Sequence, residues 1–154
     1  MTAQLAGAWN FPTRVVTGPG RIKDLPELCR SHAISRPLVV TDRGLADSTI
    51  IARVLTLLSE AGATAALFSD VKSNPTEANL LAGLGAFRVG RHDGVVAIGG
   101  GSALDVGKCV AFMVAQERPV WDFEDVADWW KRAKTDGVAQ IGRASCRERV
   151  YHPV

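Results

Sequence analysis

Short apolar runs alternate with longer stretches of helical periodicity along most of the chain. The runs are rich in β-branched residues and suit strands buried on both faces of a parallel sheet. Such strands are expected at 38–41, 63–68 and 95–98, and 14–17 also has strand character. Apolar residues spaced at i, i+3, i+4 and i+7 predict helices at 22–32, 47–61, 76–89 and 102–116. The alternation predicts an α/β domain with a mainly parallel sheet and helices on both of its faces.

Polar or glycine-rich residues follow three of these predicted strands. Asp42 comes directly after the first, a loop at 70–75 follows the second, and a turn at 99–102 follows the third. Ligands of open α/β sheets bind at the carboxyl ends of the strands, near the point where the strand order reverses. Three candidate elements at one sheet edge therefore predict a binding site there.

The turn at 99–102 consists of Gly99, Gly100, Gly101 and Ser102, between an apolar strand and a helix. Ser102 is a good residue to cap the helix, and Asp105 lies where a carboxylate can reach back to that cap. A backbone without Cβ atoms lets phosphate approach the main-chain N–H groups, and the helix end favours negative charge. The stretch predicts a phosphate cradle, with a ligand-free glycine turn as the alternative.

Two common phosphate motifs do not fit this turn. The last position of the dinucleotide fingerprint G-x-G-x-x-G/A would fall on Leu104. A P-loop would need glycine at Ser102 and a hydroxyl residue at Cys109, directly after Lys108. Lys108 is either a charge directed at phosphate or a solvated helix residue.

Length and charge narrow the class of protein. The 154 residues suit one domain. The net charge of +2 comes from residues 141–154, and the other 140 residues carry 15 basic and 15 acidic side chains. This balance argues against nucleic acid or an anionic membrane as a partner. With no apolar run of about 18 residues and no secretory signal at the N-terminus, a cytoplasmic protein is expected.

The three cysteines argue against a metal knuckle or a disulfide scaffold. Cys29, Cys109 and Cys146 are widely spaced and form no C-x-x-C pair. The first two fall in predicted helices and are expected to be small apolar fillers.

The string Gly-Gly-Gly-Ser-x-x-Asp-x-x-Lys at 99–108 resembles the signature of the iron-containing (group III) alcohol dehydrogenases. Three further places agree in order and spacing: Phe11-Pro12-Thr13 with Gly18 and Gly20, residues 38–42, and Asn74-Pro75-Thr76. The resemblance runs from about residue 10 to about residue 140. It implies the Rossmann-like N-terminal domain of a two-domain dehydrogenase, with the helical metal domain absent.

Asp42 is the first expected cofactor ligand. After a buried strand, its carboxylate can accept two hydrogen bonds from a ribose diol, and it would repel a 2′-phosphate. This favours NAD over NADP, although Arg43 beside it could offset a phosphate. A carboxylate that caps the following helix is the alternative interpretation. In the resembled family this position binds the adenosine ribose.

The remaining expected ligands surround the pyrophosphate. The backbone N–H groups of 99–102 and the Ser102 hydroxyl would hold it. Asn74 is expected to be extended, because Pro75 follows it. By resemblance its side chain reaches the cofactor, and a plain turn residue is the alternative. Three roles stay open for Asp105: it orients the loop, it contacts the nicotinamide half of the cofactor, or it only caps the helix.

The resemblance also implies the chemistry. Members of the family transfer a hydride between an alcohol or aldehyde and NAD, and an Fe²⁺ or Zn²⁺ ion polarises the alkoxide. The family's metal ligands lie in a later helical domain. His32, His92 and His152 are scattered without ligand spacing, so no catalytic or metal-binding residue is assigned. The chain alone is therefore expected to be inactive, and a homo-oligomer is compatible with the prediction.

The C-terminal part of the chain departs from this pattern. Residues 121–132 are expected to form an amphipathic helix with Val126 beside Trp129 or Trp130. Residues 141–154 resemble the translation of a sequencing adapter, where the family would enter a buried strand. We therefore expect a dinucleotide-binding domain at 1–140, belonging to a truncated protein, and a non-native tail at 141–154 that forms no strand.

Three other functions stay open at this point. One is a nucleotide-binding module without catalysis, and another is a relative of glycerol dehydrogenase or dehydroquinate synthase. The third is a flavodoxin-like phosphoacceptor domain that uses Asp42. The third would need an acidic cluster at the strand ends and a lysine after a later strand, and neither is evident.

Overall fold

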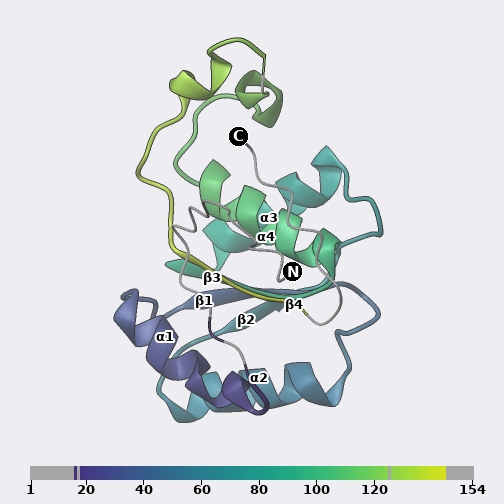
Figure 1. Cartoon of the computed structure of the whole chain (residues 1–154), viewed down its shortest axis with the longest axis vertical. Helices are drawn as coiled ribbons and strands as arrows, with labels where there is room; N and C mark the ends of the chain where they lie inside the picture. Colours follow the sequence, from purple (N-terminus) through teal and green to yellow (C-terminus); the bar gives the residue numbers. More distant parts are fainter. Residues whose placement is uncertain (1–15, 17, 125, 145–154) are drawn as a thin grey trace, which may run out of the picture.

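The computed structural model describes residues 16, 18–124 and 126–144 (Figure 1). Within these residues one parallel sheet has the strand order β2-β1-β3-β4. The strands are β1 (Pro37–Val40), β2 (Ala66–Phe68), β3 (Gly94–Gly99) and β4 (Gln140–Ala144). The predicted α/β fold with a parallel sheet is confirmed. The strand expected at 14–17 lies outside the described residues, apart from Val16.

Helices cover both faces of the sheet, as predicted. Figure 1 shows α1 and α2 on one face and α3 and α4 on the other. The α-helices are α1 (Leu25–Ser31), α2 (Thr49–Glu60), α3 (Glu77–Val89) and α4 (Gly101–Met113). Shorter 3-10 helices are η1 (Arg21–Asp24), η2 (Val120–Phe123) and η3 (Trp129–Arg132). None of the helices in the described part of the chain is long and apolar enough to span a membrane.

The central strands β1 and β3 separate two cores. Every residue of both strands is buried. Val39 and Val96 pack with the side chains of α1 and α2, whereas Val40 and Val95 pack with those of α3 and α4. Successive side chains of a strand point to opposite faces, so a continuous apolar run is what a sheet covered on both faces requires.

Two glycines let the helices on one face approach closely. A Cβ built on Gly107 of α4 would lie 2.6 Å from the Cβ of Ala97 in β3. A Cβ on Gly83 of α3 would lie 2.9 Å from Cγ2 of Val110 in α4. Such short separations do not occur between real side chains, so α4 can lie this close to β3 and α3 only with glycine at both positions.

The strand order reverses between β1 and β3. From β1 the chain moves outward to β2, then crosses back to β3 on the other side of β1, and continues to β4. Connections that leave in opposite directions open a crevice at the carboxyl ends of the two central strands. The predicted ligand elements therefore need to meet at the ends of β1 and β3.

The strand predicted at 63–68 and the helix predicted at 121–132 differ from the structure. The strand expected at 63–68 is shorter and begins at Ala66. The helix expected at 121–132 is wrong, because η2 and η3 are separate and Ala127 between them has a left-handed φ of 49°. An L-residue in that conformation interrupts a right-handed helix.

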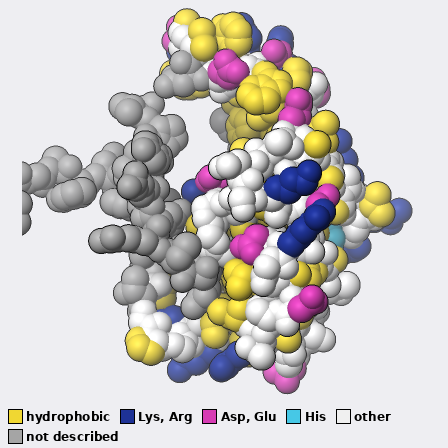
Figure 2. Space-filling view, turned by 90° about the vertical axis from the view of Figure 1, so that its right-hand side faces the viewer, with side chains coloured by type: hydrophobic (Ala, Val, Ile, Leu, Met, Phe, Trp, Pro, Cys, Tyr) yellow, Lys and Arg dark blue, Asp and Glu magenta, His cyan; other side chains and the backbone are white. Residues whose placement is uncertain are grey.

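The aromatic residues of this segment project from the molecule. The side chains of Trp121 and Trp130 are 55% and 59% exposed, so they do not pack on the core as an amphipathic helix would. Arg132 lies over the Trp129 ring, 4.5 Å from its centroid. Figure 2 shows hydrophobic side chains gathered at this upper end of the molecule.

Residues 141–144 belong to the sheet. β4 pairs in parallel with β3, with Gln140 opposite Val95 and Ala144 opposite Gly99. The expectation that no strand forms after residue 140 is therefore wrong as far as Ala144. Pairing uses the backbone, so a strand can form here without the apolar run that a buried strand usually shows. Residues 145–154 lie outside the described residues, and the non-native origin of the tail stays a prediction.

Candidate functional site

The site begins where the ends of β1 and β3 meet. Gly99 closes β3 with a φ of +154°, and a Cβ built on it would lie 2.8 Å from Oδ2 of Asp42. The same Cβ would lie 2.8 Å from Cβ of Ala103 in α4. The Asp42 carboxylate therefore lies directly against the backbone where the glycine turn starts. The structure brings these two predicted elements together at one edge of the sheet.

Thr41 fixes the end of β1 that carries Asp42. Its side chain is completely buried, and its hydroxyl donates a hydrogen bond of 2.7 Å to the Ile98 carbonyl in β3. Its backbone N–H donates to the Phe68 carbonyl at the end of β2, at 3.0 Å. One residue thus ties the carboxyl ends of three strands together. Since Asp42 is the next residue, its backbone position is set by the sheet.

Asp42 does not cap the following helix. The α2 helix begins at Thr49, and Ser48 is its cap, with Oγ accepting a hydrogen bond of 3.4 Å from the Ile51 N–H. A turn separates the two, in which the Leu45 N–H donates to the Asp42 carbonyl at 3.1 Å. The capping interpretation of Asp42 is therefore wrong. Its half-buried carboxylate lies at the switch point instead.

The cap of α4 lies two residues earlier than predicted. Gly100 is the cap residue, and its carbonyl accepts from the Leu104 N–H at 3.2 Å. Ser102, predicted as the cap, lies in the first turn of the helix. A Cβ on Gly101 would meet no atom of the described residues within 4 Å, so these residues leave space beside the helix start. The first N–H groups of an α-helix have no partner inside the helix, and they favour an anion in such a space.

Asp105 does not complete the cap. With the helix starting at Gly101, Asp105 lies in the second turn, too far along to reach the cap residue. Its exposed carboxylate lies 3.9 Å from Nζ of Lys108 instead. The capping interpretation is wrong, and a contact between Asp105 and a cofactor stays a prediction.

Asn74 lies in the loop that follows β2. Its φ of 58° is left-handed, so the expectation of an extended residue before Pro75 is wrong. Asparagine tolerates this conformation better than most residues, which suits a turn. The side chain is exposed at the same edge of the sheet as Asp42. Its contact with the cofactor stays a prediction.

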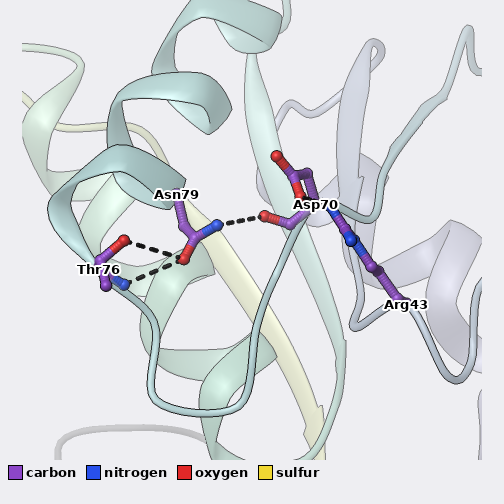
Figure 3. A network of polar contacts seen from close by, with 4 residues as sticks. All are labelled: Arg43, Asp70, Thr76 and Asn79. Atoms are coloured by element: carbon purple, nitrogen blue, oxygen red, sulfur yellow. Dashed lines mark hydrogen bonds and ion pairs between the residues drawn. The ribbon is translucent and has the colours of Figure 1, made fainter.

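A polar network beside Asp42 was not predicted (Figure 3). The Arg43 guanidinium forms an ion pair with the Asp70 carboxylate. The Asp70 backbone carbonyl accepts a hydrogen bond of 2.8 Å from Nδ2 of Asn79, and Oδ1 of Asn79 accepts one of 3.0 Å from the Thr76 N–H. The spacing of Thr76 and Asn79 matches that of a capping box, a signal that sequence reasoning could have used.

The described residues do not fit a catalytic metal ion. No three His, Cys, Asp or Glu side chains among them are grouped so that they could hold one. The ring of His92 is engaged with its neighbours, since Nδ1 lies 2.9 Å from the Arg36 carbonyl and the ring lies against Phe87. No step of a reaction is therefore assigned to metal ligands in this part of the chain.

The two described cysteines are packing residues. Burial, with a smaller contribution from the Asp93 charge, raises the pKa of the Cys29 thiol to about 11. Burial also raises the pKa of Cys109. A thiol that stays protonated is a poor nucleophile and a poor metal ligand. The prediction that both are small apolar fillers agrees with this.

Comparisons with known proteins agree with this arrangement. A sequence model of the iron-containing alcohol dehydrogenases matches residues 12–142. The 4-hydroxybutyrate dehydrogenase of Cupriavidus necator is 35% identical over 98 residues, which are 64% of this chain and 25% of the relative. The NAD-dependent methanol dehydrogenase of Bacillus methanolicus is 27% identical over 116 residues, 75% of this chain and 30% of the relative.

Solved structures show the same relationship. The crystal structure of a 1,3-propanediol oxidoreductase matches 83% of this chain with a TM-score of 0.77 and 28% identity, over 32% of its own length. The chain thus spans between a quarter and a third of the length of the relatives described here. The family match covers most of the sequence, and the fold and the glycine turn agree with it. The chain belongs to the iron-containing alcohol dehydrogenase family.

Proposed function

We propose that the chain binds the ADP half of NAD and forms the cofactor-binding part of a longer alcohol dehydrogenase. The observation that carries the proposal is the position of the Asp42 carboxylate against Gly99, beside the open start of α4. A sugar-binding carboxylate and a phosphate-binding helix end are the two groups that an ADP moiety requires. Here both lie at the point where the strand order reverses.

Each group has a defined role in this proposal. Asp42 accepts hydrogen bonds from the 2′- and 3′-hydroxyls of the adenosine ribose, and its charge disfavours the 2′-phosphate of NADP. The N–H groups at the start of α4 bind the pyrophosphate, and Ser102 adds a hydroxyl. Gly101 leaves the space that a phosphate needs, since a side chain there would project into it.

The chemistry of the longer protein follows from the family. When bound, NAD accepts a hydride from the substrate or returns one to it. The names of the relatives refer to 4-hydroxybutyrate, methanol and 1,3-propanediol, which supports a small alcohol or aldehyde as the substrate. The described residues supply cofactor binding only, so we expect the chain by itself to bind NAD weakly and to leave alcohols unoxidised.

A binding titration tests the proposal. Isothermal titration of the 154-residue chain should show binding of NAD and of ADP-ribose, and weaker binding of NADP. Asp42→Asn removes a charge-assisted interaction of about 1.5–3 kcal/mol and should weaken NAD binding roughly 10-fold or more. Asp136→Asn removes the same charge from an exposed position outside the site and serves as the matched control. If NAD does not bind, or binds Asp42→Asn as well as the unaltered chain, the proposed function is wrong.

A further inference from the structure

We propose that the ion pair between Arg43 and Asp70 strengthens the preference of this site for NAD over NADP, because Asp70 keeps Arg43 from pairing with a 2′-phosphate. The inference rests on the proposed function, because it concerns the same dinucleotide at the same strand ends. It assigns a specificity role to Asp70, a residue that contacts neither the ribose nor the pyrophosphate in the proposed arrangement.

Arg43 is placed to meet a 2′-phosphate. It directly follows Asp42, whose carboxylate is the proposed ligand of the ribose hydroxyls. An arginine close to this carboxylate is the usual partner of the 2′-phosphate of NADP. In this structure the Arg43 guanidinium is turned to the Asp70 carboxylate, in an ion pair whose side chains are 67% and 49% exposed.

The backbone of Asp70 is held independently of Arg43. Its carbonyl accepts the hydrogen bond from Asn79, a residue of α3 that is only 3% exposed. The Thr76 N–H and hydroxyl both donate to Oδ1 of the same Asn79, at 3.0 and 3.3 Å, which fixes the amide (Figure 3). A buried amide thus positions the backbone that carries the competing carboxylate. Asp70 therefore remains beside the site even when Arg43 leaves it.

The charges around Arg43 then affect the binding of NAD and NADP differently. The Asp70 carboxylate pairs with the Arg43 guanidinium and offsets its positive charge, and the Asp42 carboxylate belongs to the preceding residue. A 2′-phosphate would have to draw Arg43 away from Asp70 and would still face both carboxylates. NAD carries a neutral hydroxyl at this position, so Asp70 has almost no effect on its binding. Exposed ion pairs are weak and break readily, so the expected change is modest and confined to NADP.

Fluorescence titrations with NADH and NADPH test this role. Asp70→Asn removes the competing charge and keeps the backbone carbonyl that binds Asn79, so the fold should be unaffected. We expect NADPH to bind the variant about 5-fold more tightly and NADH to change less than about 2-fold. The matched control is Asp128→Asn, which breaks another exposed ion pair, between Oδ2 of Asp128 and Nζ of Lys131 at 2.9 Å. It should change the affinity for neither NADH nor NADPH.

A double-mutant cycle identifies the group that Asp70 acts through. In Arg43→Gln combined with Asp70→Asn, the gain for NADPH should disappear, because no arginine remains to be released. A gain that survives in the double variant would overturn the inference and would point to another cation of the loop, such as Lys72. Equal gains for NADH and NADPH in Asp70→Asn would also overturn it.

The outcome separates this inference from the proposed function. Suppose that NADH binds, that Asp42→Asn weakens NADH binding, and that Asp70→Asn leaves the affinity for NADPH unchanged. In that case only the role of Asp70 is wrong. If NADH fails to bind the unaltered chain, the proposed function is wrong and the role of Asp70 is wrong with it. Thermal unfolding of each variant confirms that the compared proteins are equally folded.

Discussion

The Asp42 carboxylate fills the place where a side chain at Gly99 would have to lie. A Cβ on Gly99 would be 2.8 Å from Oδ2 of Asp42, and the φ of +154° is one that L-residues rarely adopt. The two residues lie at the carboxyl ends of the neighbouring strands β1 and β3 and are far apart in the sequence. Their close approach makes the backbone conformation at Gly99 and the position of the Asp42 carboxylate, the proposed ribose ligand, depend on each other.

Gly99→Ala should therefore damage both stability and binding. The added methyl group clashes with Asp42 and Ala103 and needs a strained backbone, which costs about 1–3 kcal/mol. Urea denaturation should show the loss of stability. In the matched variant Gly101→Ala the methyl enters open space, so stability should hold while NAD binding weakens. Normal NAD binding by a folded Gly101→Ala variant would contradict a phosphate position beside this residue.

Thr41→Val should loosen the ends of the strands. The substitution keeps the shape of the side chain but leaves the Ile98 carbonyl without the hydroxyl that donates to it at 2.7 Å. A buried acceptor that loses its donor costs about 1–3 kcal/mol in the free energy of unfolding. Thr41→Ser retains the hydroxyl and is the control, which should be closer to the unaltered chain. Equal unfolding midpoints for the valine and serine variants would show that this hydrogen bond contributes little.

Gly107→Ala should separate α4 from β3. Its methyl group would lie 2.6 Å from Cβ of Ala97, and overpacking of this kind costs about 1–3 kcal/mol. Gly85→Ala is the comparison, because Gly85 is an exposed residue of α3 whose added Cβ would meet no described atom within 4 Å. That variant should gain about 0.5–1 kcal/mol, because alanine favours a helix over glycine. Opposite shifts in the thermal midpoint are expected, and a gain in both variants would contradict the close approach.

Asp93 should make stability depend on pH in the acid range. Partial burial raises the pKa of this carboxyl, but hydrogen bonds from Ser35 and Arg36 outweigh that effect and hold it below its ordinary value of 3.8. The Ser35 N–H and hydroxyl donate at 2.9 and 2.6 Å, and the Arg36 N–H at 2.7 Å. Because the pKa is lowered on folding, the stabilisation is complete above 3.8 and is lost as the pH falls through the pKa of the folded state.

Urea denaturation of the unaltered chain and of Asp93→Asn between pH 7 and pH 3 measures this contribution. The difference in free energy of unfolding should be about 1 kcal/mol at neutral pH and should shrink towards pH 3. A difference that stays constant over this range would show that the charge of Asp93 is not responsible.

Much of this fold is local in origin and could be predicted for that reason. The run from Val95 to Ile98 and the periodicity of α2 depend on near neighbours in the sequence. The shared edge of Asp42 and Gly99 followed as well, because parallel strands place their carboxyl ends together. The cap of α4 was displaced by two residues, from Ser102 to Gly100, since glycine can take the extended conformation of a cap without a side-chain oxygen.

Other features depend on groups that the sequence does not connect. β4 is held by backbone pairing with β3, and the residues at 140–144 have no apolar pattern that predicts a strand. The ion pair of Arg43 and Asp70 joins two loops, and many other charged residues were equally plausible partners. The left-handed backbone of Ala127 divides an otherwise helical segment, and nothing about alanine signals that conformation.

The hydrogen bonds of Thr41 have a consequence for how this scaffold can diversify. Because one buried residue holds the ends of three strands together, the edge of the sheet is fixed independently of the loops that leave it. Insertions or exchanges in those loops could therefore change what binds at this edge, while the spacing between Asp42 and the start of α4, the proposed sugar-binding and phosphate-binding groups, would stay the same.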